Sequence, residues 1–377
     1  MVSNMRKLGE LVRIRTGKLD ANANDPLGEF PFFTCAREPL RIFTYSYDCE
    51  CILIAGNGDL NVKYYNGKFD AYQRTYIIES VDHNEMDVRY LFHFMSLYVE
   101  KLRGMSIGGV VKYIKLENLT EAKLPLPALS EQKRIAAILD KVDSMRAKRK
   151  EAMAQLDTLV HAFFVEMFGD PVTNPKSWQR VSFESLLENI DSGWSPICLD
   201  RPASENEWGV LKLGAVTQCT YLQDQNKALP TDIEPDPDLE VKPGDLLFSR
   251  KNTYDLVAAC ALVHETRSRL MLPDLIFRFR FRKGASINSC YIHQLFCNPA
   301  KRQQIQKLAT GTAGSMPNIS KGRLLKAEIE VPPILLQNAF EQKVKLIEQQ
   351  KKLYQQSLLQ LECLFACLQH RAFRGEL

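Results

Sequence analysis

Two long stretches of the chain carry apolar residues at heptad spacing, and they limit the possible folds more than any other feature. The first stretch follows Pro127 and stops at a Gly-Asp-Pro sequence at residues 169–171, which are typical helix boundaries. Its apolar heptad positions are Ile135, Val142, Leu156 and Phe163 in one line and Ile138, Met145, Ala152 and Leu159 in a second line. Only Arg149 interrupts the first line. This pattern predicts one long helix.

The second stretch follows Pro332 and Pro333, and Lys351 is its only basic interruption. Its apolar heptad positions are Phe340, Ile347, Tyr354, Leu361 and Leu368, with Val344, Leu358 and Phe365 between them. Sustained apolar heptads with polar flanks are typical of coiled coils. Each helix of about 35 residues would be about 50 Å long. We predict an antiparallel coiled coil of the two helices; two helices packed on globular units are the alternative.

The chain contains an internal repeat that includes these helices. Residues 101–170 match residues 306–375 at a constant offset of 205, which pairs Pro127 with Pro332 and Gln132 with Gln337. Further upstream, residues 8–17 resemble 184–193, residues 51–58 resemble 245–252, and Tyr90-Leu91 resembles Tyr291-Ile292. The repeat is far longer than a solenoid period. It therefore indicates a duplicated domain, with the two halves related by a pseudo-twofold axis.

The segments between the helices have the pattern of mixed α+β domains. Short β-rich runs at 41–47, 51–56, 74–80, 245–249, 256–263 and 275–281 alternate with turn sequences, and helices are expected at 87–102 and at about 291–308. The predicted fold class is α+β, with two tandem α+β domains separated by two long helices. The predicted boundaries are 1–128 and 171–332 for the domains, with helices at 129–170 and 333–377.

The composition is that of an ordinary globular protein. Of 377 residues, 45% are hydrophobic and 25% are charged, with a net charge of +4, which excludes a disordered chain. No apolar run reaches the roughly 18 residues of a membrane helix, and the N-terminal residues lack a signal-peptide pattern. The ten cysteines are scattered without paired CxxC motifs. We therefore expect a cytoplasmic protein with reduced cysteines, no membrane and no zinc site.

Basic residues concentrate in one part of the second domain. Residues 175–245 carry 6 basic and 13 acidic residues, whereas residues 246–330 carry 14 basic and 5 acidic residues. Such a patch is expected for a polyanionic partner. Arg278, Arg280 and Arg282 alternate within a predicted strand and should share one face, either toward this partner or as an ordinary solvated face.

The first domain interleaves basic, aromatic and amide residues in the segment 57–76. Lysines there can contact phosphates, Asn, Gln and Arg can bond base edges, and tyrosines can stack. The alternative is a hairpin whose tyrosines face the core. The domain as a whole carries 16 basic and 16 acidic residues.

Catalytic motifs are missing from the sequence. There is no adenine-methylation motif of the N-P-P-Y type and no P-loop, and the Gly-Asn-Gly at 56–58 is too weak for a cofactor site. Asp236, Glu240 and Lys242 superficially offer a nuclease set, but Asp236 and Glu240 lie too close in sequence to reach one metal ion from adjacent strands. The chain is expected to have no catalytic or metal-binding residues.

Four segments resemble the specificity (S) subunit of Type I restriction–modification systems. They are LPLPALSEQKRIAAILDKVDSMRAKRKEAMAQLDTL at 124–159, LQHRAFRGEL at 368–377, VKPGDLLFSRKNT at 241–253 and GKFDAYQRTYIIE at 67–79. The resemblance covers essentially the whole chain, including the alternation of domain and helix. One departure is that the second helix has Phe340 where the first has Ile135.

The resemblance implies a function. Each domain would be a target-recognition domain that reads one half of a bipartite site in double-stranded DNA, and the paired helices would dock two methyltransferase subunits, with restriction subunits possible. S-adenosylmethionine, ATP and Mg²⁺ would belong to those partners, so this chain would bind no cofactor and catalyse nothing. A non-catalytic coiled-coil scaffold is the alternative function.

The candidate DNA contacts are donor-bearing residues of predicted loops. In the first domain they are Lys63, Tyr64, Lys68, Gln73, Arg74 and Lys112. In the second domain they are Arg250, Lys251, Asn252, Tyr254, Arg267, Arg269, Ser315, Asn318 and Lys321.

Overall fold

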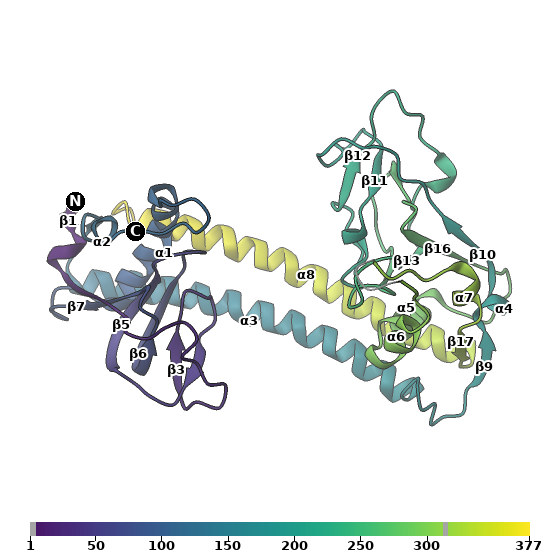
Figure 1. Cartoon of the computed structure of the whole chain (residues 1–377), viewed down its shortest axis with the longest axis horizontal. Helices are drawn as coiled ribbons and strands as arrows, with labels where there is room; N and C mark the ends of the chain where they lie inside the picture. Colours follow the sequence, from purple (N-terminus) through teal and green to yellow (C-terminus); the bar gives the residue numbers. More distant parts are fainter. Residues whose placement is uncertain (1–4, 312–315) are drawn as a thin grey trace. The chain divides into compact units, whose positions relative to one another are not determined.

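The computed structural model describes residues 5–311 and 316–377, and it divides the chain into two compact units (Figure 1). Unit 1 comprises the residues up to Ala152 together with Tyr354–Leu377, and unit 2 comprises Met153–Leu353. Each unit contains one of the two predicted domains and a part of both long helices. The predicted contact Ser315 lies outside the described residues.

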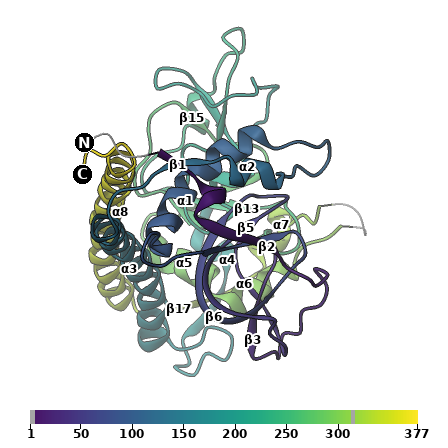
Figure 2. The ribbon, with the colours of Figure 1, turned by 90° about the vertical axis from the view of Figure 1, so that its left-hand side faces the viewer.

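Unit 1 is built on a six-stranded sheet with the strand order β2-β7-β5-β6-β3-β4 (Figure 2). Alternate side chains of the central strand enter different cores: Ile52 and Ile54 pack with α1, whereas Cys51 and Leu53 pack on the opposite face. The sheet is therefore buried on both faces. The elements are β1 (Met5–Lys7), β2 (Val12–Thr16), β3 (Phe30–Phe33), β4 (Leu40–Ile42), β5 (Tyr47–Ala55), β6 (Val62–Ala71), β7 (Thr75–Ser80), α1 (Val88–Met105), α2 (Leu116–Thr120) and β8 (Lys123–Pro125).

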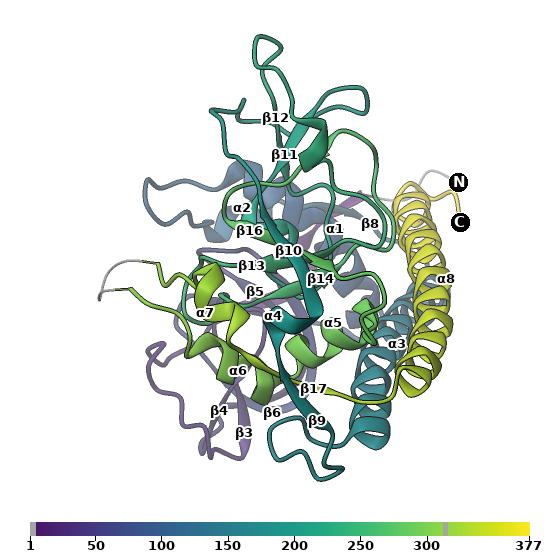
Figure 3. The same cartoon turned by 90° about the vertical axis from the view of Figure 1, so that its right-hand side faces the viewer.

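Unit 2 repeats the central part of this arrangement with shorter strands (Figure 3). Its strands β10-β16-β13 correspond to β2-β7-β5, and β9-β17 corresponds to β1-β8. A further sheet, β12-β11-β15, has no counterpart in this correspondence. The elements are β9 (Gln179–Ser182), α4 (Phe183–Leu186), β10 (Leu187–Ser192), β11 (Gly209–Leu211), β12 (Asn226–Ala228), β13 (Leu246–Ser249), β14 (Cys260–Leu262), β15 (Leu270–Met271), β16 (Ile276–Phe281), α5 (Ser289–Cys297), α6 (Pro299–Gln306), α7 (Lys321–Leu325) and β17 (Glu328–Val331).

The two long helices are α3 (Leu129–Phe168) and α8 (Ile334–Ala372), close to the predicted ranges. In unit 1 they pack antiparallel, since Arg146 lies over the Phe365 ring and Lys150 pairs with Glu362. In unit 2 Asp157 pairs with Lys351, and the rings of Phe164 and Phe340 lie 5.8 Å apart, again with opposite chain directions.

Of the two heptad lines predicted for α3, only the first has no exposed apolar residue: Ile135 and Val142 are buried, and Leu156 and Phe163 are half-buried. Met145 and Leu159, from the second line, are 48% and 39% exposed, so this line does not form a continuous buried seam. Leu139, which neither line includes, is fully buried against the core of unit 1. The helix turns its apolar face toward the globular part as well as toward α8, and a strict heptad pattern does not capture this.

The predicted helix at about 291–308 is wrong, because the structure has two helices there. Pro299 has no N–H for helical hydrogen bonding, and α5 ends before it. The side chain of Asn298 then caps α6 by accepting hydrogen bonds from the backbone N–H groups of Ala300 and Lys301. The run at 256–263 is also mostly not a strand, since only Cys260–Leu262 pairs in a sheet.

A buried glutamine fixes the start of each long helix to its unit. Gln132 is fully buried; its amide donates to the carbonyls of Glu85 and Pro127 and its oxygen accepts from Asp87 N–H. Gln337, also fully buried, makes the same three contacts with Ser286, Pro332 and Asn288 in unit 2.

The tyrosine pair also repeats. The Tyr90 hydroxyl donates to the carbonyl of Pro125, and the Tyr291 hydroxyl donates to the carbonyl of Glu330, each at 2.8 Å. Pro125 and Glu330 are related by the offset of 205 found in the sequence. The same bonds thus hold the helix after β7 or β16 against the strand before the long helix.

Replacing Gln337 by Ala should destabilise unit 2 by about 2–3 kcal/mol, because three backbone groups lose the buried amide as their partner. All three tryptophans, Trp178, Trp194 and Trp208, lie in unit 2, so tryptophan fluorescence during urea unfolding reports on this unit alone. Gln342→Ala is the matched control, since Gln342 is an exposed residue of the same helix. Equal stability of the two variants would contradict the role of Gln337.

Candidate nucleic-acid interface

In unit 1 the central strand β5 ends where two other loops meet it. Gly56 N–H donates to the carbonyl of Arg74, which precedes β7, at 2.8 Å. Gly58 N–H donates to the Lys112 carbonyl at 2.9 Å, and Ile114 N–H donates to the Gly56 carbonyl at 2.9 Å. We call these three backbone hydrogen bonds, with the residues they join, the strand-end junction of unit 1.

Unit 2 has a strand-end junction with the same three bonds. Arg250 N–H donates to the Leu275 carbonyl at 3.1 Å, Asn252 N–H to the Pro317 carbonyl at 3.3 Å, and Ile319 N–H to the Arg250 carbonyl at 2.8 Å. The junction residues are thereby matched one to one between the units, and the match agrees with the sequence correspondence of 51–58 with 245–252. The backbone is shared while the side chains differ, which suits a site whose specificity varies on a fixed scaffold.

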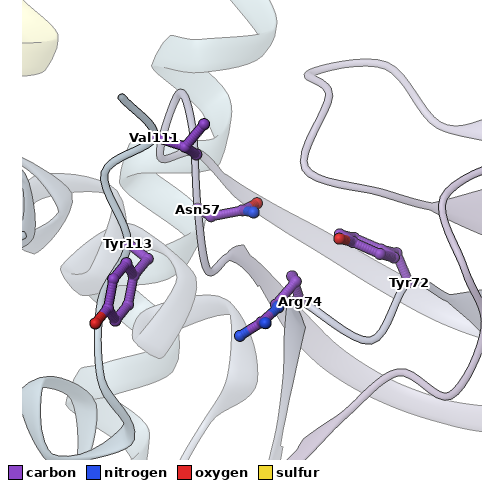
Figure 4. Close-up of a pocket in the computed structure, with 5 residues that line it drawn as sticks. All are labelled: Asn57, Tyr72, Arg74, Val111 and Tyr113. Atoms are coloured by element: carbon purple, nitrogen blue, oxygen red, sulfur yellow. The ribbon is translucent and has the colours of Figure 1, made fainter. Parts of the chain in front are cut away.

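A pocket of about 510 Å³ opens at the junction of unit 1 and is lined by Asn57, Tyr72, Arg74, Val111 and Tyr113 (Figure 4). The two tyrosine rings lie on either side, with the Asn57 amide and the Arg74 guanidinium between them. Amide and guanidinium groups are the side chains that bond base edges, and aromatic rings can stack on bases. The pocket thus combines the groups expected of a base-reading site.

Three of the residues predicted in unit 1 lie at or beside this junction. Arg74 lines the pocket, and Lys112 is an exposed residue of the loop that Gly58 contacts. Gln73 is exposed next to Arg74, and its amide donates to the Asp20 carboxylate at 3.0 Å.

The other three predicted residues of unit 1 lie on β6, outside the pocket lining. Lys63 is half-buried and donates to the Asn61 side chain, and burial lowers the pKa of its ammonium group. Burial raises the pKa of Tyr64, and its hydrogen bond to Glu50 at 2.7 Å adds to this, giving a pKa of about 12. Tyr64 packs on the core, as the hairpin alternative expected. Lys68 is exposed, with its ammonium 4.6 Å from the centre of the Tyr45 ring.

In unit 2 Arg250 is held at the junction by several contacts. Its Nε donates to the Asn318 amide oxygen at 3.1 Å, and its guanidinium carbon lies 5.0 Å from the centre of the Phe277 ring. The Lys321 ammonium lies 5.7 Å from the same ring. The structure therefore brings three of the predicted residues, Arg250, Asn318 and Lys321, to one place.

Three predicted residues continue from Arg250 along the chain. Lys251 is half-buried and forms a backbone bridge with Asn318. Asn252 is only 7% exposed, and its amide oxygen accepts from Thr253 N–H, so the side chain serves the turn. Tyr254 is 63% exposed and is available to a partner.

Arg267 and Arg269 lie apart from the junction, in the loop before β15. Arg267 donates to the carbonyl of Glu207 at 3.0 Å. Arg269 has a positive φ of 64°, and its backbone N–H donates to the Glu240 carboxylate at 2.7 Å. Both residues contribute to the conformation of this loop, and their contact with DNA stays a prediction.

The polyanion-facing role expected for Arg278 is wrong. Arg278 and Arg280 do share a face, since both donate to the Asp191 carboxylate, but Arg278 is only 2% exposed. It also pairs with Asp245 at 3.2 Å, and Arg282 donates to the Leu187 carbonyl. The acidic residues that saturate this face lie far away in sequence, Asp191 in β10 and Asp245 just before β13, which the local pattern could not reveal.

The residues of the nuclease alternative have local structural roles. Asp236 caps a short 3₁₀ helix by accepting from Asp238 N–H, and the Glu240 carboxylate accepts from Arg269 N–H. Among the described residues, no group of three or more His, Cys, Asp or Glu side chains could hold a metal ion.

Within that part of the chain, no helix is long and apolar enough to cross a bilayer.

The candidate list omits four residues of the pocket, namely Asn57, Tyr72, Val111 and Tyr113, although the first two lie in the segment 57–76 that the sequence singled out. The repeat carried a signal for one of them: Tyr113 is the counterpart of the predicted contact Asn318 at the offset of 205. Subtracting the repeat offset from the position of Asn318 leads directly to Tyr113.

Comparisons of sequence and of structure both find similarity to specificity subunits of Type I restriction–modification systems. Residues 3–155 match the family described as the Type I restriction modification DNA specificity domain. The chain is 38% identical over 153 residues to the Type I restriction enzyme EcoDI specificity subunit of Escherichia coli, covering 41% of this chain and 33% of that protein. It is 35% identical over 168 residues to the EcoEI specificity subunit, covering 44% and 28% of the two chains. The aligned region thus spans about a third of the length of these relatives.

Other similarities cover more of the chain. The EcoKI specificity subunit of Escherichia coli is 26% identical over 313 residues, covering 76% of this chain and 65% of that protein. The crystal structure of a Type I restriction–modification S subunit from M. genitalium matches with a TM-score of 0.63 and 14% identity, covering 98% and 96% of the chains. A structure from a study of complex assembly in the type I R-M system matches with a TM-score of 0.54 and 17% identity, covering 99% and 98%. These structures share the α+β fold of this chain.

Replacing Arg278 by Met should destabilise unit 2 by about 3–5 kcal/mol near neutral pH, because Asp191 and Asp245 lose a buried partner. Burial alone would raise the pKa of the Asp191 carboxyl, but hydrogen bonds from Arg280 and Arg278 outweigh burial and lower it. This stabilisation is complete above the unfolded-state pKa of about 3.9 and is lost as the pH falls through the lower folded-state pKa. The deficit of the variant should therefore shrink in acid.

Urea unfolding followed by tryptophan fluorescence at about pH 7 and about pH 3 measures this difference. Lys283→Met is the control, because Lys283 is an exposed residue just after the same strand. A deficit that is the same for both variants, or that does not change with pH, would argue against the buried ion pairs.

Proposed function

Because the chain is related to the specificity subunits of Type I restriction–modification systems, we propose that it recognises the DNA target of such a complex. Each unit reads one half of a bipartite site in double-stranded DNA. The observation that carries this proposal is the pair of strand-end junctions, which have one backbone and different donor side chains. A protein that reads two different half-sites needs such a pair.

The charge distribution supports contact with DNA. Residues 246–330, which include the junction of unit 2, carry 14 basic and 5 acidic residues. Arg278 and Arg280 are committed to internal ion pairs, so the phosphate contacts fall to the remaining basic residues, including Lys321. The even charge balance of residues 1–128, with 16 basic and 16 acidic residues, leaves part of the phosphate contacts of this domain to partner subunits.

The partners in this proposal are two methyltransferase subunits, and restriction subunits in a complete system. The long helices offer apolar surface for docking, since Leu346, Leu353 and Leu359 of α8 are 66%, 59% and 58% exposed. S-adenosylmethionine, ATP and Mg²⁺ belong to the partners, and this chain supplies specificity without catalytic residues. A free-standing coiled-coil scaffold, the alternative, would use the same leucines but would not need the junctions.

Methylome sequencing of cells that express the chain with its cognate methyltransferase subunit tests the proposal. We expect methylated adenines within one split motif, because two units read two separate half-sites. A continuous motif would contradict the architecture. If the chain neither directs methylation nor, with its partner, binds duplex DNA in a salt-dependent way, the scaffold alternative is favoured.

Exchanging the recognition segment of unit 2, residues 175–330, for that of a related subunit should change one half of the motif only. The other half and the spacer should persist, because unit 1 and both long helices are unchanged.

Removing one heptad from each helix, around Arg149 and Lys351, should instead change the spacer and leave both halves intact. A constant spacer in the shortened variant would show that the helices do not set it.

A further inference from the structure

The two strand-end junctions each contain one arginine at their centre, but from different positions of the shared backbone. In unit 2 it is Arg250, whose counterpart in unit 1 is Gly56; in unit 1 it is Arg74, whose counterpart in unit 2 is Leu275. The first bond of each junction defines this correspondence: Gly56 N–H donates to Arg74 and Arg250 N–H donates to Leu275. The arginine is therefore the acceptor residue of this backbone hydrogen bond in unit 1 and the donor residue in unit 2.

Sterics explain why unit 1 cannot carry the arginine at the strand end. A Cβ atom added to Gly56 would lie 2.4 Å from the carbonyl oxygen of Arg74, a distance that a backbone acceptor does not tolerate. A side chain at position 56 is therefore excluded in this backbone, and the adjoining turn residue provides the guanidinium instead. Arg74 lines the pocket together with Asn57, and its guanidinium lies between the two tyrosine rings (Figure 4).

Both guanidinium groups keep donors for a ligand. In unit 2, Arg250 uses one N–H to Asn318 at 3.1 Å and one to the Asp274 carbonyl at 3.5 Å. A guanidinium has five N–H donors, so three remain. In unit 1, the Arg74 side chain has no hydrogen bond or ion pair within residues 5–311 and 316–377. The Arg250 guanidinium is thus partly positioned and not saturated, and the donors of Arg74 are not used by such bonds.

We propose that Arg74 and Arg250 are equivalent specificity-determining residues, each of which reads one guanine in its half-site. This inference rests on the proposed function. The O6 and N7 atoms of guanine form the pair of acceptors that a guanidinium fork matches in the major groove, and this contact carries sequence information that a phosphate contact does not. The contacts of Arg250 with Asn318 and Phe277 hold its guanidinium in one orientation, as a bidentate contact with a planar base edge requires.

Arginine-to-lysine substitutions separate base reading from phosphate binding, because lysine keeps the charge and loses the fork. We expect methylomes directed by Arg250→Lys to lose the preference for one guanine in one half of the motif, and those directed by Arg74→Lys to lose one guanine in the other half. The unaffected half of each motif shows that the variant is folded. Arg280→Lys and Arg6→Lys are the matched controls, since both arginines form ion pairs outside the junctions, and they should leave the motif unchanged.

A change in the DNA provides a second test that does not depend on the stability of any variant. In the complex with the methyltransferase subunit, 7-deazaguanine at the identified position removes the N7 acceptor from an oligonucleotide carrying the motif. We expect wild-type binding to weaken by roughly 5- to 150-fold, and the corresponding lysine variant to show little further loss on this DNA.

Three outcomes overturn the inference. They are an unchanged motif for both lysine variants, a loss of methylation that is uniform across sequences, and additive losses from lysine and 7-deazaguanine. A wild-type chain that gives no split motif would instead refute the proposed function itself. The two failures are therefore distinguishable.

Discussion

The rest of the structure depends on one buried glutamine in each unit, whose side-chain amide forms hydrogen bonds with backbone groups of two segments. Gln132 and Gln337 are fully buried, and each satisfies three backbone groups that come from two different segments. A buried amide group left without partners costs about 1–3 kcal/mol, so burial of these two side chains strongly favours a single geometry. In each unit it fixes the first turn of the long helix to the loop before α1 or α5.

The strand-end junctions use the same principle near the surface. Three backbone hydrogen bonds set the path of the chain, so that the side chains at the junction can change without changing the fold. In unit 1 the junction carries the side chains of Asn57, Tyr113 and Arg74. In unit 2 it carries those of Lys251, Asn318 and Arg250. The duplication thus provides two sites of common geometry and different chemistry, and that combination suits the reading of two unlike half-sites.

Much of the fold could be predicted from the sequence because the strongest signals were periodic. The heptads gave both long helices within a few residues, and the repeat offset paired Gln132 with Gln337, whose contacts are the same in the two units. The strands and the site depended on long-range contacts that local patterns do not contain. The charge of Arg278 suggested an external partner, whereas Asp191 and Asp245 neutralise it from within. Ser315 lies outside the described residues, and the role of the other candidates as DNA contacts stays a prediction.

Hydrogen exchange on the complex with the methyltransferase subunit, with and without its DNA target, tests the central claim most directly. The account predicts that DNA slows exchange at both junctions, in the segments 56–58 and 112–114 of unit 1 and 250–252 and 317–319 of unit 2. The Arg267–Arg269 loop and β6 should change less. Protection confined to one unit, or to surfaces away from both junctions, would contradict the claim that two equivalent junctions read the DNA.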